Sequence, residues 1–246
     1  MANKTLYALL VAINNYPIQR HCLRGCVADR DEFKNYLKRN FENSDVQLKI
    51  KTLTDSEATK ANIIKHFQDF KKAKSDDICL FYFSGHGSQA PAPKEFWHME
   101  PDRMSESVVC YDSRLPQGKD LMDKEQAYLI HEVTKANNPH FIAIFDCCHS
   151  GSNTRGVGDM YTARMAEPAH TPTKIDDYYG YQYYKKVQRD GYVDLSPPKG
   201  THIQFAAAKS NETAKELKIN GKVRGIFTYY LIESLEKTGS HLTYAE

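Results

Sequence analysis

The apolar residues of this chain follow two alternating patterns. Short continuous or alternating runs, typical of β-strands, occupy residues 6–13, 48–53, 78–83, 141–145 and 203–208. Apolar residues at helical spacing occupy residues 27–41, 61–70, 123–133 and 226–235. Because strands alternate with helices along the chain, the pattern predicts an α/β fold whose parallel sheet is covered on both faces.

Two long stretches interrupt this alternation, at residues 87–122 and 150–200. Segments this long without regular elements inside one domain are usually functional or disordered. The second stretch holds five tyrosines between Tyr178 and Tyr184. Two roles stay open for this cluster: packing over an active site, or forming a surface for a partner.

Composition narrows the class of protein. The 246 residues carry 33 Lys and Arg against 31 Asp and Glu, a net charge of +2, so broad electrostatic capture of nucleic acid is not expected. Neither a membrane-spanning run nor a secretory leader is recognisable, so we expect no membrane partner. The six cysteines contain no Cys-x-x-Cys pair, which argues against structural zinc and favours reduced thiols in the cytoplasm.

Chemistry-bearing residues follow two of the predicted strands. Residues 81–87 read Phe-Tyr-Phe-Ser-Gly-His-Gly, and residues 144–151 read Ile-Phe-Asp-Cys-Cys-His-Ser-Gly. In open α/β sheets, ligands bind in the crevice beyond the carboxyl ends of the strands. If the two strands are neighbours, His86 and Cys148 face one crevice.

A cysteine and a histidine in one crevice favour acyl transfer. Only the thiolate is a good nucleophile, and a nearby imidazole can take its proton and later protonate the leaving group. The backbone N–H groups of Gly87 and Cys148 are candidates to stabilise the oxyanion. The simplest reaction of this kind is peptide hydrolysis, with His86, Cys148 and Gly87 as the catalytic residues.

These motifs resemble those of the caspase superfamily of cysteine peptidases. The run at 84–87 is similar to its histidine motif, and the run at 146–151 is similar to the cysteine motif of metacaspases and their prokaryotic relatives, the orthocaspases. The match implies that Cys148, and not Cys147, is the nucleophile. Residues 23–29, 206–208 and 225–228 resemble further landmarks of the superfamily.

The resemblance also implies an architecture. We expect a caspase-like three-layer α/β/α sandwich with a mostly parallel central sheet of about six strands. Residues 1–246 would form a single peptidase domain. Within it, residues 1–150 resemble the large subunit, residues 151–200 the loop between subunits, and residues 201–246 a small subunit that is shortened at its end.

The resemblance to metacaspases implies cleavage of proteins or peptides after Arg or Lys. The family's pocket for a basic residue corresponds here to Asp29, Asp146, Ser84 and Cys26. Two carboxylates at the floor of a pocket favour a guanidinium, which can bind them in a bidentate manner. Asp29 has a second reading as an acidic residue at the start of a helix, and both roles can coexist.

The loop after Cys148 is rich in basic residues: Arg155, Arg164, Lys174, Lys185, Lys186 and Arg189. A peptidase with an acidic pocket could therefore process itself within residues 150–200. A solvated loop without that role is the alternative.

Many metacaspases require calcium, but the family's calcium ligands are incomplete here. The first matching position is Asp112, whereas the next is Ser113 and a third is Arg155. Calcium prefers several oxygen ligands, and an arginine repels it. We therefore expect no cofactor and activity without calcium.

Two functions other than peptide hydrolysis are alternatives for this sequence. A cysteine phosphatase would need five residues between its cysteine and arginine, but six separate Cys148 from Arg155, which argues against that class. The other rival is a catalytically silent or zymogen-like interaction module, regulated by a partner or by a further region of the protein. The presence of both His86 and Cys148 argues against lost catalysis, and a closed zymogen stays open.

Overall fold

The computed structural model describes residues 4–148, 161–169, 173–189, 195–208, 212–238 and 244. A central sheet has the strand order β2-β1-β3-β7-β9, and every neighbouring pair in it is parallel. Its strands are β1 (Lys4–Ala12), β2 (Val46–Thr54), β3 (Ile78–Ser84), β7 (His140–Asp146) and β9 (Ile203–Ala206). The expected count of about six strands is therefore too high for the described residues, where each of the five apolar runs supplies one strand.

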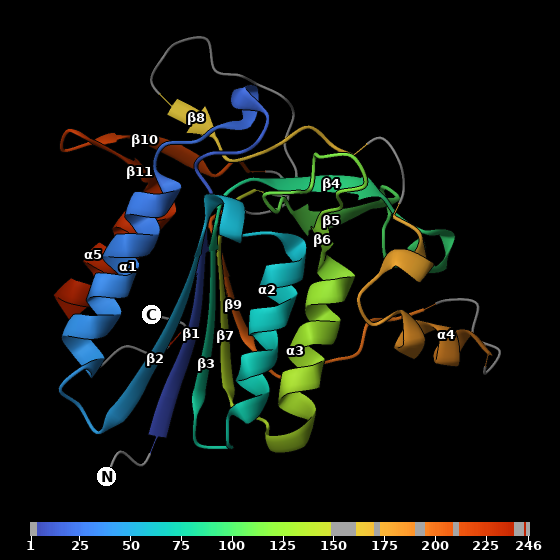
Figure 1. Ribbon diagram of the computed structural model, residues 1–246, viewed down its shortest axis with the longest axis horizontal. Helices are drawn as coiled ribbons and strands as arrows, with labels where there is room; N and C mark the ends of the chain where they lie inside the picture. Colours follow the sequence, from blue (N-terminus) through green and yellow to red (C-terminus); the bar gives the residue numbers. More distant parts are fainter. Residues whose placement is uncertain are drawn as a thin grey trace.

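Helices cover both faces of this sheet, which gives the expected α/β/α sandwich (Figure 1). The helices α1 (Cys26–Phe41) and α5 (Ile226–Thr238) lie on one face. The helices α2 (Lys60–Phe67) and α3 (Asp123–Asn137) lie on the other. The helix-spaced patterns in the sequence therefore correspond to the four helices that pack against the sheet.

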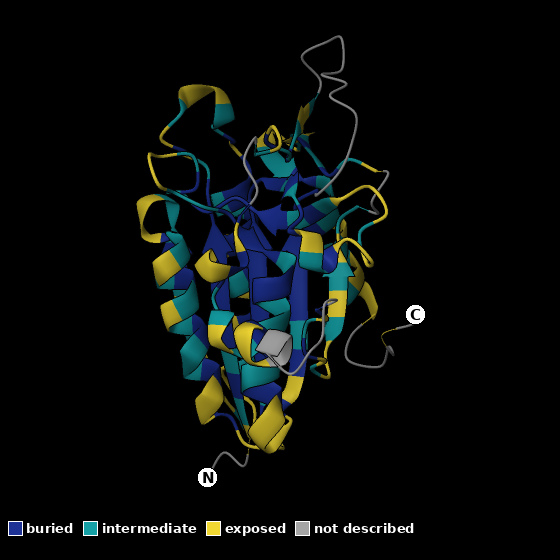
Figure 2. Ribbon diagram, turned by 90° about the vertical axis from the view of Figure 1, so that its right-hand side faces the viewer, coloured by how far each residue is buried: buried dark blue, intermediate teal, exposed yellow. Residues whose placement is uncertain are grey.

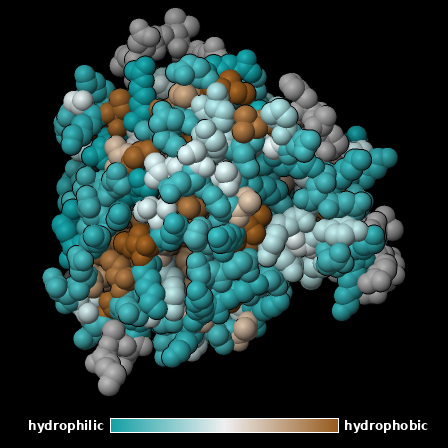
Figure 3. Space-filling model, in the orientation of Figure 1, coloured by the Kyte–Doolittle hydropathy of each residue, from teal (hydrophilic) through white to brown (hydrophobic). Residues whose placement is uncertain are grey.

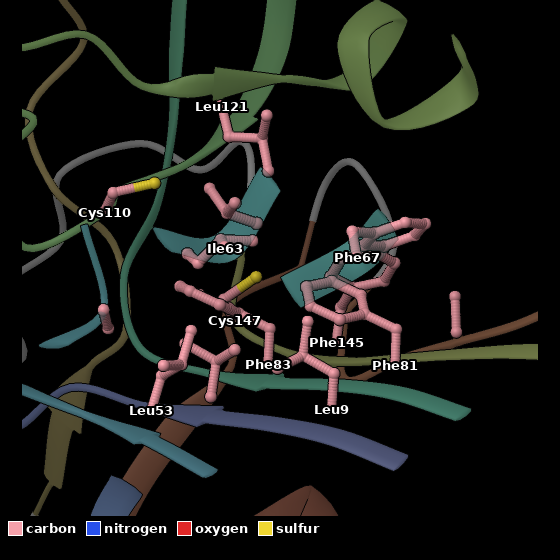
Figure 4. Packing of buried hydrophobic residues seen from close by; sticks show 14 of the residues in the cluster. Leu9, Leu53, Ile63, Phe67, Phe81, Phe83, Cys110, Leu121, Phe145 and Cys147 are labelled. Atoms are coloured by element: carbon pink, nitrogen blue, oxygen red, sulfur yellow. The ribbon is translucent and has the colours of Figure 1, made fainter. Parts of the chain in front are cut away.

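Two hydrophobic cores separate the three layers, because successive side chains of a strand point to opposite faces. In β1, Leu9 and Val11 belong to the core beneath α2 and α3, part of which is seen in Figure 4. Leu6, Ala8 and Leu10 belong to the core beneath α1 and α5. Burial on both faces explains why the inner strands β1, β3 and β7 read as continuous apolar runs, and much of the interior in Figure 2 is coloured as buried.

Two small antiparallel sheets lie beyond the carboxyl ends of the central strands (Figure 1). The first consists of β4 (Gly87–Pro91), β5 (Met104–Val108) and β6 (Leu121–Met122), all from the first irregular stretch. The second consists of β8 (Tyr161–Ala163), β10 (Lys215–Ile219) and β11 (Lys222–Gly225). These two sheets therefore flank the region into which the chain continues after β3 and β7.

Short 3₁₀-helices connect the larger elements: Gln19–His21, Asp55–Glu57, Gln68–Lys72, Lys94–Phe96 and Ile175–Asp177. The tyrosine cluster follows the last of these directly and continues into α4 (Tyr181–Arg189). Tyr178 and Tyr184 are buried against Phe96, and the Tyr184 hydroxyl donates to the Lys124 carbonyl at 3.0 Å. The cluster therefore anchors the second irregular stretch to the start of α3.

The exposed surface in Figure 3 is mostly hydrophilic, with small separate hydrophobic areas. In the part of the chain that the structure describes, none of the helices combines the length and the hydrophobicity that crossing a membrane requires.

Candidate active site

The sheet brings the two motifs together. β3 and β7 are parallel neighbours, and their register pairs Ser84 with Asp146. His86 and Cys148 each follow two residues later in the chain, so both leave the sheet at the same edge. The expectation that His86 and Cys148 share one region is therefore confirmed by topology, while their catalytic roles stay predictions.

The imidazole of His86 is held in one orientation. Its Nε2 lies 2.8 Å from the carbonyl oxygen of His21, which can only accept, so Nε2 carries the proton. The backbone N–H of His86 donates to the Tyr16 hydroxyl at 2.9 Å, and the Tyr16 and His86 rings pack at 5.1 Å. The buried Nδ1 has no hydrogen-bond partner among the described residues. In the neutral ring this Nδ1 is the basic nitrogen.

Burial keeps both members of the Cys–His pair uncharged in this conformation. His86 is 4% exposed, and burial lowers its pKa to about 4. Cys148 is fully buried, and burial raises the pKa of its thiol to about 11, although the Ala214 carbonyl opposes the shift as a hydrogen-bond partner. Cys147, by contrast, points into the core beneath α2, beside Phe83 (Figure 4).

Gly87 and Cys148 direct their backbone N–H groups at a single atom. Both donate to the carbonyl oxygen of Arg164, at 3.1 and 3.3 Å respectively. Two convergent N–H donors on one carbonyl oxygen are the arrangement that stabilises an oxyanion in acyl transfer. The two N–H groups that the sequence suggested as oxyanion donors therefore converge on one atom. That atom is the carbonyl oxygen of Arg164 in the same chain.

The Arg164 side chain occupies an acidic pocket and is completely buried. Its Nη1 lies 2.8 Å from Asp146 Oδ2 and donates to Ser84 Oγ at 2.9 Å. Its Nη2 lies 2.6 Å from Asp29 Oδ2 and 3.4 Å from Glu216 Oε2. Three carboxylates and one hydroxyl thus surround a single guanidinium.

Backbone and hydroxyl donors fix the three carboxylates. Asp29 accepts from the Gly225 N–H at 2.8 Å, and Asp146 accepts from the N–H and the hydroxyl of Thr228 at 3.2 and 2.5 Å. Glu216 accepts at 2.9 Å from each of two N–H groups, those of Arg24 and Gly25, just before α1 begins. The donors that hold the carboxylates in place for a cation therefore come from the residues just before α1, from the end of β11 and from the first turn of α5.

The electrostatics of the pocket reflect burial and mutual charge. Burial raises the pKa of Asp29 to about 7, and the Arg164 guanidinium opposes this shift while the Asp146 carboxylate adds to it. Burial disfavours the charge on Arg164, but Asp146 and the other acidic neighbours outweigh it and hold the Arg164 pKa well above its ordinary value. The guanidinium is therefore charged, and it faces three carboxyl groups, of which Asp29 is partly protonated near neutral pH.

Two glycines, Gly25 and Gly225, leave space for the Arg164 guanidinium and its partners. A Cβ on Gly225 would lie 2.4 Å from Arg164 Nη1 and 2.5 Å from Asp146 Oδ2. A Cβ on Gly25 would lie 3.0 Å from Glu216 Oε2. A side chain at position 225 would thus invade the pocket.

Three of the four residues predicted to line the pocket lie against the Arg164 guanidinium, and their role in binding substrate stays a prediction. Asp29, Asp146 and Ser84 contact the guanidinium directly. Cys26 is the buried first residue of α1, and burial raises its pKa while the Arg164 charge opposes that shift. Glu216 was missed because it lies on a short strand of mixed polarity and no local motif marks it.

Thr228 and Gly225 lie in a run that was identified only as a landmark. Gly225 donates its N–H to Asp29, and Thr228 donates its N–H to Asp146. Residues 225–228 therefore orient two carboxylates of the pocket.

The candidate calcium position is a poor fit to that ion. The Asp112 carboxylate accepts the Lys60 N–H at 2.9 Å, and the Ser113 hydroxyl accepts the Cys110 N–H at 2.8 Å. Both groups therefore already accept protein donors, whereas calcium prefers several free oxygen ligands. Arg155, and also His149, lie outside the described residues.

An α/β/α sandwich with a cysteine and a histidine at the carboxyl edge of its sheet defines a caspase-like fold. A family model described as "Metacaspase, peptidase C14 domain" matches residues 7–155. The chain belongs to the metacaspase family.

Among curated relatives, the chain is 28% identical to Metacaspase-1A of Aspergillus oryzae, over 95% of this chain and 61% of that protein. It is 34% identical to Metacaspase-1A of Neosartorya fischeri, over 94% of this chain and 58% of that protein. The chain thus spans about three fifths of the length of these relatives.

Among solved structures, the chain resembles the crystal structure of protein GSU0716 from Geobacter sulfurreducens. The TM-score is 0.60 at 20% identity, with 94% of this chain and 82% of that chain covered. At this identity the likeness supports the fold alone.

Proposed function

We propose that this protein is a cysteine endopeptidase that cleaves peptide bonds after Arg or Lys. One observation carries the proposal: the Arg164 carbonyl accepts from the N–H groups of Gly87 and Cys148 while its guanidinium lies among three carboxylates. This is the disposition that a basic residue needs on the amino side of a bond under attack. Membership of the metacaspase family supports the same activity.

The proposed reaction uses groups that already lie at one edge of the sheet. His86 Nδ1 removes the proton from Cys148 Sγ, and the thiolate attacks the carbonyl carbon of the substrate's basic residue. The N–H groups of Gly87 and Cys148 stabilise the oxyanion. The imidazolium then protonates the leaving amine, and a water molecule deprotonated by His86 hydrolyses the thioester.

His21 acts in this scheme as a positioning residue through its backbone. Its carbonyl accepts from His86 Nε2, which fixes the proton on that nitrogen and leaves Nδ1 basic. The same hydrogen bond strengthens as the imidazole becomes positively charged, because a charged donor makes a stronger hydrogen bond than a neutral one.

Specificity follows from the charge and shape of the pocket. A buried guanidinium requires compensation, and Asp29, Asp146 and Glu216 supply it. A substrate with an acidic residue at this position would instead add a fourth negative charge. We accordingly propose that its partners are proteins or peptides with Arg or Lys at the cleavage site.

Hydrolysis of fluorogenic peptides ending in Arg, Lys or Asp tests this proposal. The unaltered protein and Cys148→Ala are compared in parallel, each with and without calcium. We expect hydrolysis after Arg and Lys that is lost in Cys148→Ala. Hydrolysis after Asp would contradict the proposed pocket, and hydrolysis that survives in Cys148→Ala would contradict the proposed nucleophile.

Self-processing within residues 150–200 is a further part of the proposal, since this stretch supplies the arginine found in the pocket. We also propose a reducing compartment such as the cytoplasm, which the free state of all six cysteines supports.

A further inference from the structure

We propose that the surface along β4 binds the part of a substrate that follows the cleaved bond. We propose further that it selects a small residue at the second position after that bond and an acidic residue at the third. The inference rests on the proposed peptidase activity. It deepens that activity, because the acidic pocket recognises only the residue on the amino side of the bond.

Residues 165–169 of this chain show where the leaving part of a substrate would lie. The N–H groups of Gly87 and Cys148 converge on the carbonyl oxygen of Arg164, which therefore has the position of a carbonyl under attack. The residues that follow Arg164 consequently lie on the leaving side of that carbonyl.

This leaving-side segment, residues 165–169, follows β4 (Figure 1). Met165 forms a parallel bridge with Gly87, and the Ala166 N–H donates to the Gly87 carbonyl at 2.9 Å. Farther on, the Ala169 N–H donates to the Gln89 carbonyl at 2.8 Å. Pairing of an extended peptide with a strand is a general mode of peptide recognition. The backbone contacts therefore fit any sequence, and selectivity must come from the side chains.

The second residue after the bond lies in a confined space. Ala166 is 3% exposed, and it belongs to the hydrophobic core beneath α2 and α3. Met165 before it is half-buried, and Glu167 after it is exposed. Successive side chains of an extended chain point to opposite sides, so the second residue alone faces the core. A larger side chain there would overpack the site.

The backbone of the third residue is held by two side chains. Arg114 Nη2 donates to the Glu167 carbonyl at 3.1 Å, and the Ser88 hydroxyl donates to the same oxygen at 3.0 Å. The buried Asp120 fixes Arg114, because its Oδ1 accepts from Arg114 Nη1 at 2.6 Å. A hydrogen bond from a charged donor is stronger than one between neutral groups. A substrate therefore gains this contact only if it extends as far as the third carbonyl.

The side chain of the third residue meets positive charge. Glu167 Oε2 lies 3.6 Å from Arg20 Nη2. Both side chains are more than half exposed, so the ion pair adds a modest preference for an acidic residue.

A cavity of about 660 Å³ adjoins residues 167–169 and extends this positive surface. Four basic residues line it: Arg20, Arg114, Lys119 and Lys174. Apart from Glu167, the acidic residues among the described lining are Asp120 and Asp177, and these pair with two of the four. The cavity therefore keeps an excess of positive charge, which favours an acidic side chain over a basic one.

The preferred substrate consequently carries Arg or Lys, then any residue, then a small residue and then an acidic residue, with cleavage after the first. Residues 164–167 of this chain, Arg-Met-Ala-Glu, have this order. A fluorogenic peptide that ends at its basic residue supplies none of the leaving-side contacts.

Internally quenched peptides of two lengths test the inference. They share one amino-terminal half and one basic residue, and they extend two or three residues past the bond, each with a terminal amide. We expect kcat/KM to rise about tenfold or more with the third residue, because only the longer peptide supplies the third carbonyl. In the longer peptide, leucine in place of alanine at the second position should lower kcat/KM about fivefold or more. Glutamine in place of glutamate at the third should lower it about two- to fivefold.

The peptides are compared in the Arg164→Gln variant, where the chain's own guanidinium no longer pairs with the pocket carboxylates. Every productive peptide must replace the same residues of the chain. The cost of that displacement therefore cancels in the ratio of kcat/KM between two peptides.

Two further substitutions in this variant assign the contacts. Arg114→Gln should abolish most of the gain from the third residue, and Arg20→Gln should abolish the preference for glutamate over glutamine. Arg39→Gln, the same chemical change at an exposed position of α1, is the matched control and should keep both ratios. Since each ratio compares two peptides on one protein, a variant that folds less well still reports it.

Equal kcat/KM for the two lengths, or a gain that survives in full in Arg114→Gln, would overturn the inference and leave the peptidase standing. Equal or faster hydrolysis with leucine second or with glutamine third would overturn the proposed selectivity. If no peptide is hydrolysed, the proposed peptidase fails, and this inference fails with it.

Discussion

Replacing Asp146 with Asn removes one charge from the arginine pocket with little change in shape. Asp146 Oδ2 accepts from the N–H and the hydroxyl of Thr228 and contacts Arg164 Nη1, whereas its buried Oδ1 has no partner among the described residues. An asparagine can place its amide oxygen at the Oδ2 position and its NH₂ at the Oδ1 position. All three contacts therefore survive, with a neutral amide oxygen in place of a carboxylate oxygen, while the guanidinium stays charged.

The expected loss in kcat/KM depends on the carboxylates that remain in the pocket. Asp29 and Glu216 still compensate the guanidinium, so no charge is left buried and unpaired. What is lost is the assistance of charge to one hydrogen bond. The effect of removing one charge from a hydrogen bond is scaled by the step from about 1.5–3 kcal/mol for bonds to charged groups to about 0.5–1.5 kcal/mol for neutral bonds. The difference, about 1–2 kcal/mol, corresponds to a roughly 5- to 30-fold loss in kcat/KM, mostly through KM.

The assay is hydrolysis of an Arg fluorogenic peptide in the Arg164→Gln background, where the chain's own guanidinium no longer pairs with the pocket carboxylates. Asp45→Asn, the same chemical change at an exposed position on the approach to β2, is the matched control. We expect its kcat/KM to equal that of the background protein. An unchanged KM in Asp146→Asn would refute the reasoning, because the carboxylate would then make no contribution to binding a basic residue.

Three further predictions concern shape, protonation and metal. Gly225→Ala should weaken binding of Arg peptides by about 1–3 kcal/mol, because its methyl group overlaps the guanidinium site. An unaltered KM with an unchanged melting temperature would contradict that position for the guanidinium. Burial lowers the His86 pKa to about 4, so neutral imidazole, the basic form, predominates above that pH. The rate of self-cleavage should therefore fall only as pH drops towards 4, whereas peptide hydrolysis by protein already cut within residues 150–200 should fall near pH 6.5, where an exposed imidazole titrates. Coincident acid limbs in the two profiles would contradict the lowered pKa of His86 in the uncut protein. A calcium chelator should leave peptide hydrolysis unchanged, because Asp112 and Ser113 already accept backbone donors; loss of activity that added calcium restores would contradict this.

The order of elements and the position of the Cys–His pair were predictable from the sequence for local reasons. Strands buried on both faces must read as continuous apolar runs, and helices packed on a sheet must repeat their apolar residues at helical spacing. His86 and Cys148 each follow such a run directly. Parallel pairing of β3 with β7 is then sufficient to bring the two residues to one edge of the sheet.

The number of strands was less well determined. The resemblance implied about six, while the described residues form five central strands and two small antiparallel sheets. The strands of those small sheets are short and of mixed polarity, so they carry no strong period along the chain.

Sequence alone therefore predicted the layered fold, the meeting of His86 and Cys148 at one edge of the sheet, and three acidic or hydroxyl residues that surround the guanidinium, since each depends on a local pattern or on a motif. Tertiary structure alone decided which basic residue fills the pocket and that Glu216 helps to hold it. The Arg164 guanidinium meets Asp29 across 135 positions of the chain, and Glu216 is oriented by backbone donors more than 190 positions away. Contacts of that range arise from how β8, β10 and α1 pack together. A buried guanidinium needs several charged partners at once, and only the folded chain brings them within reach of one another.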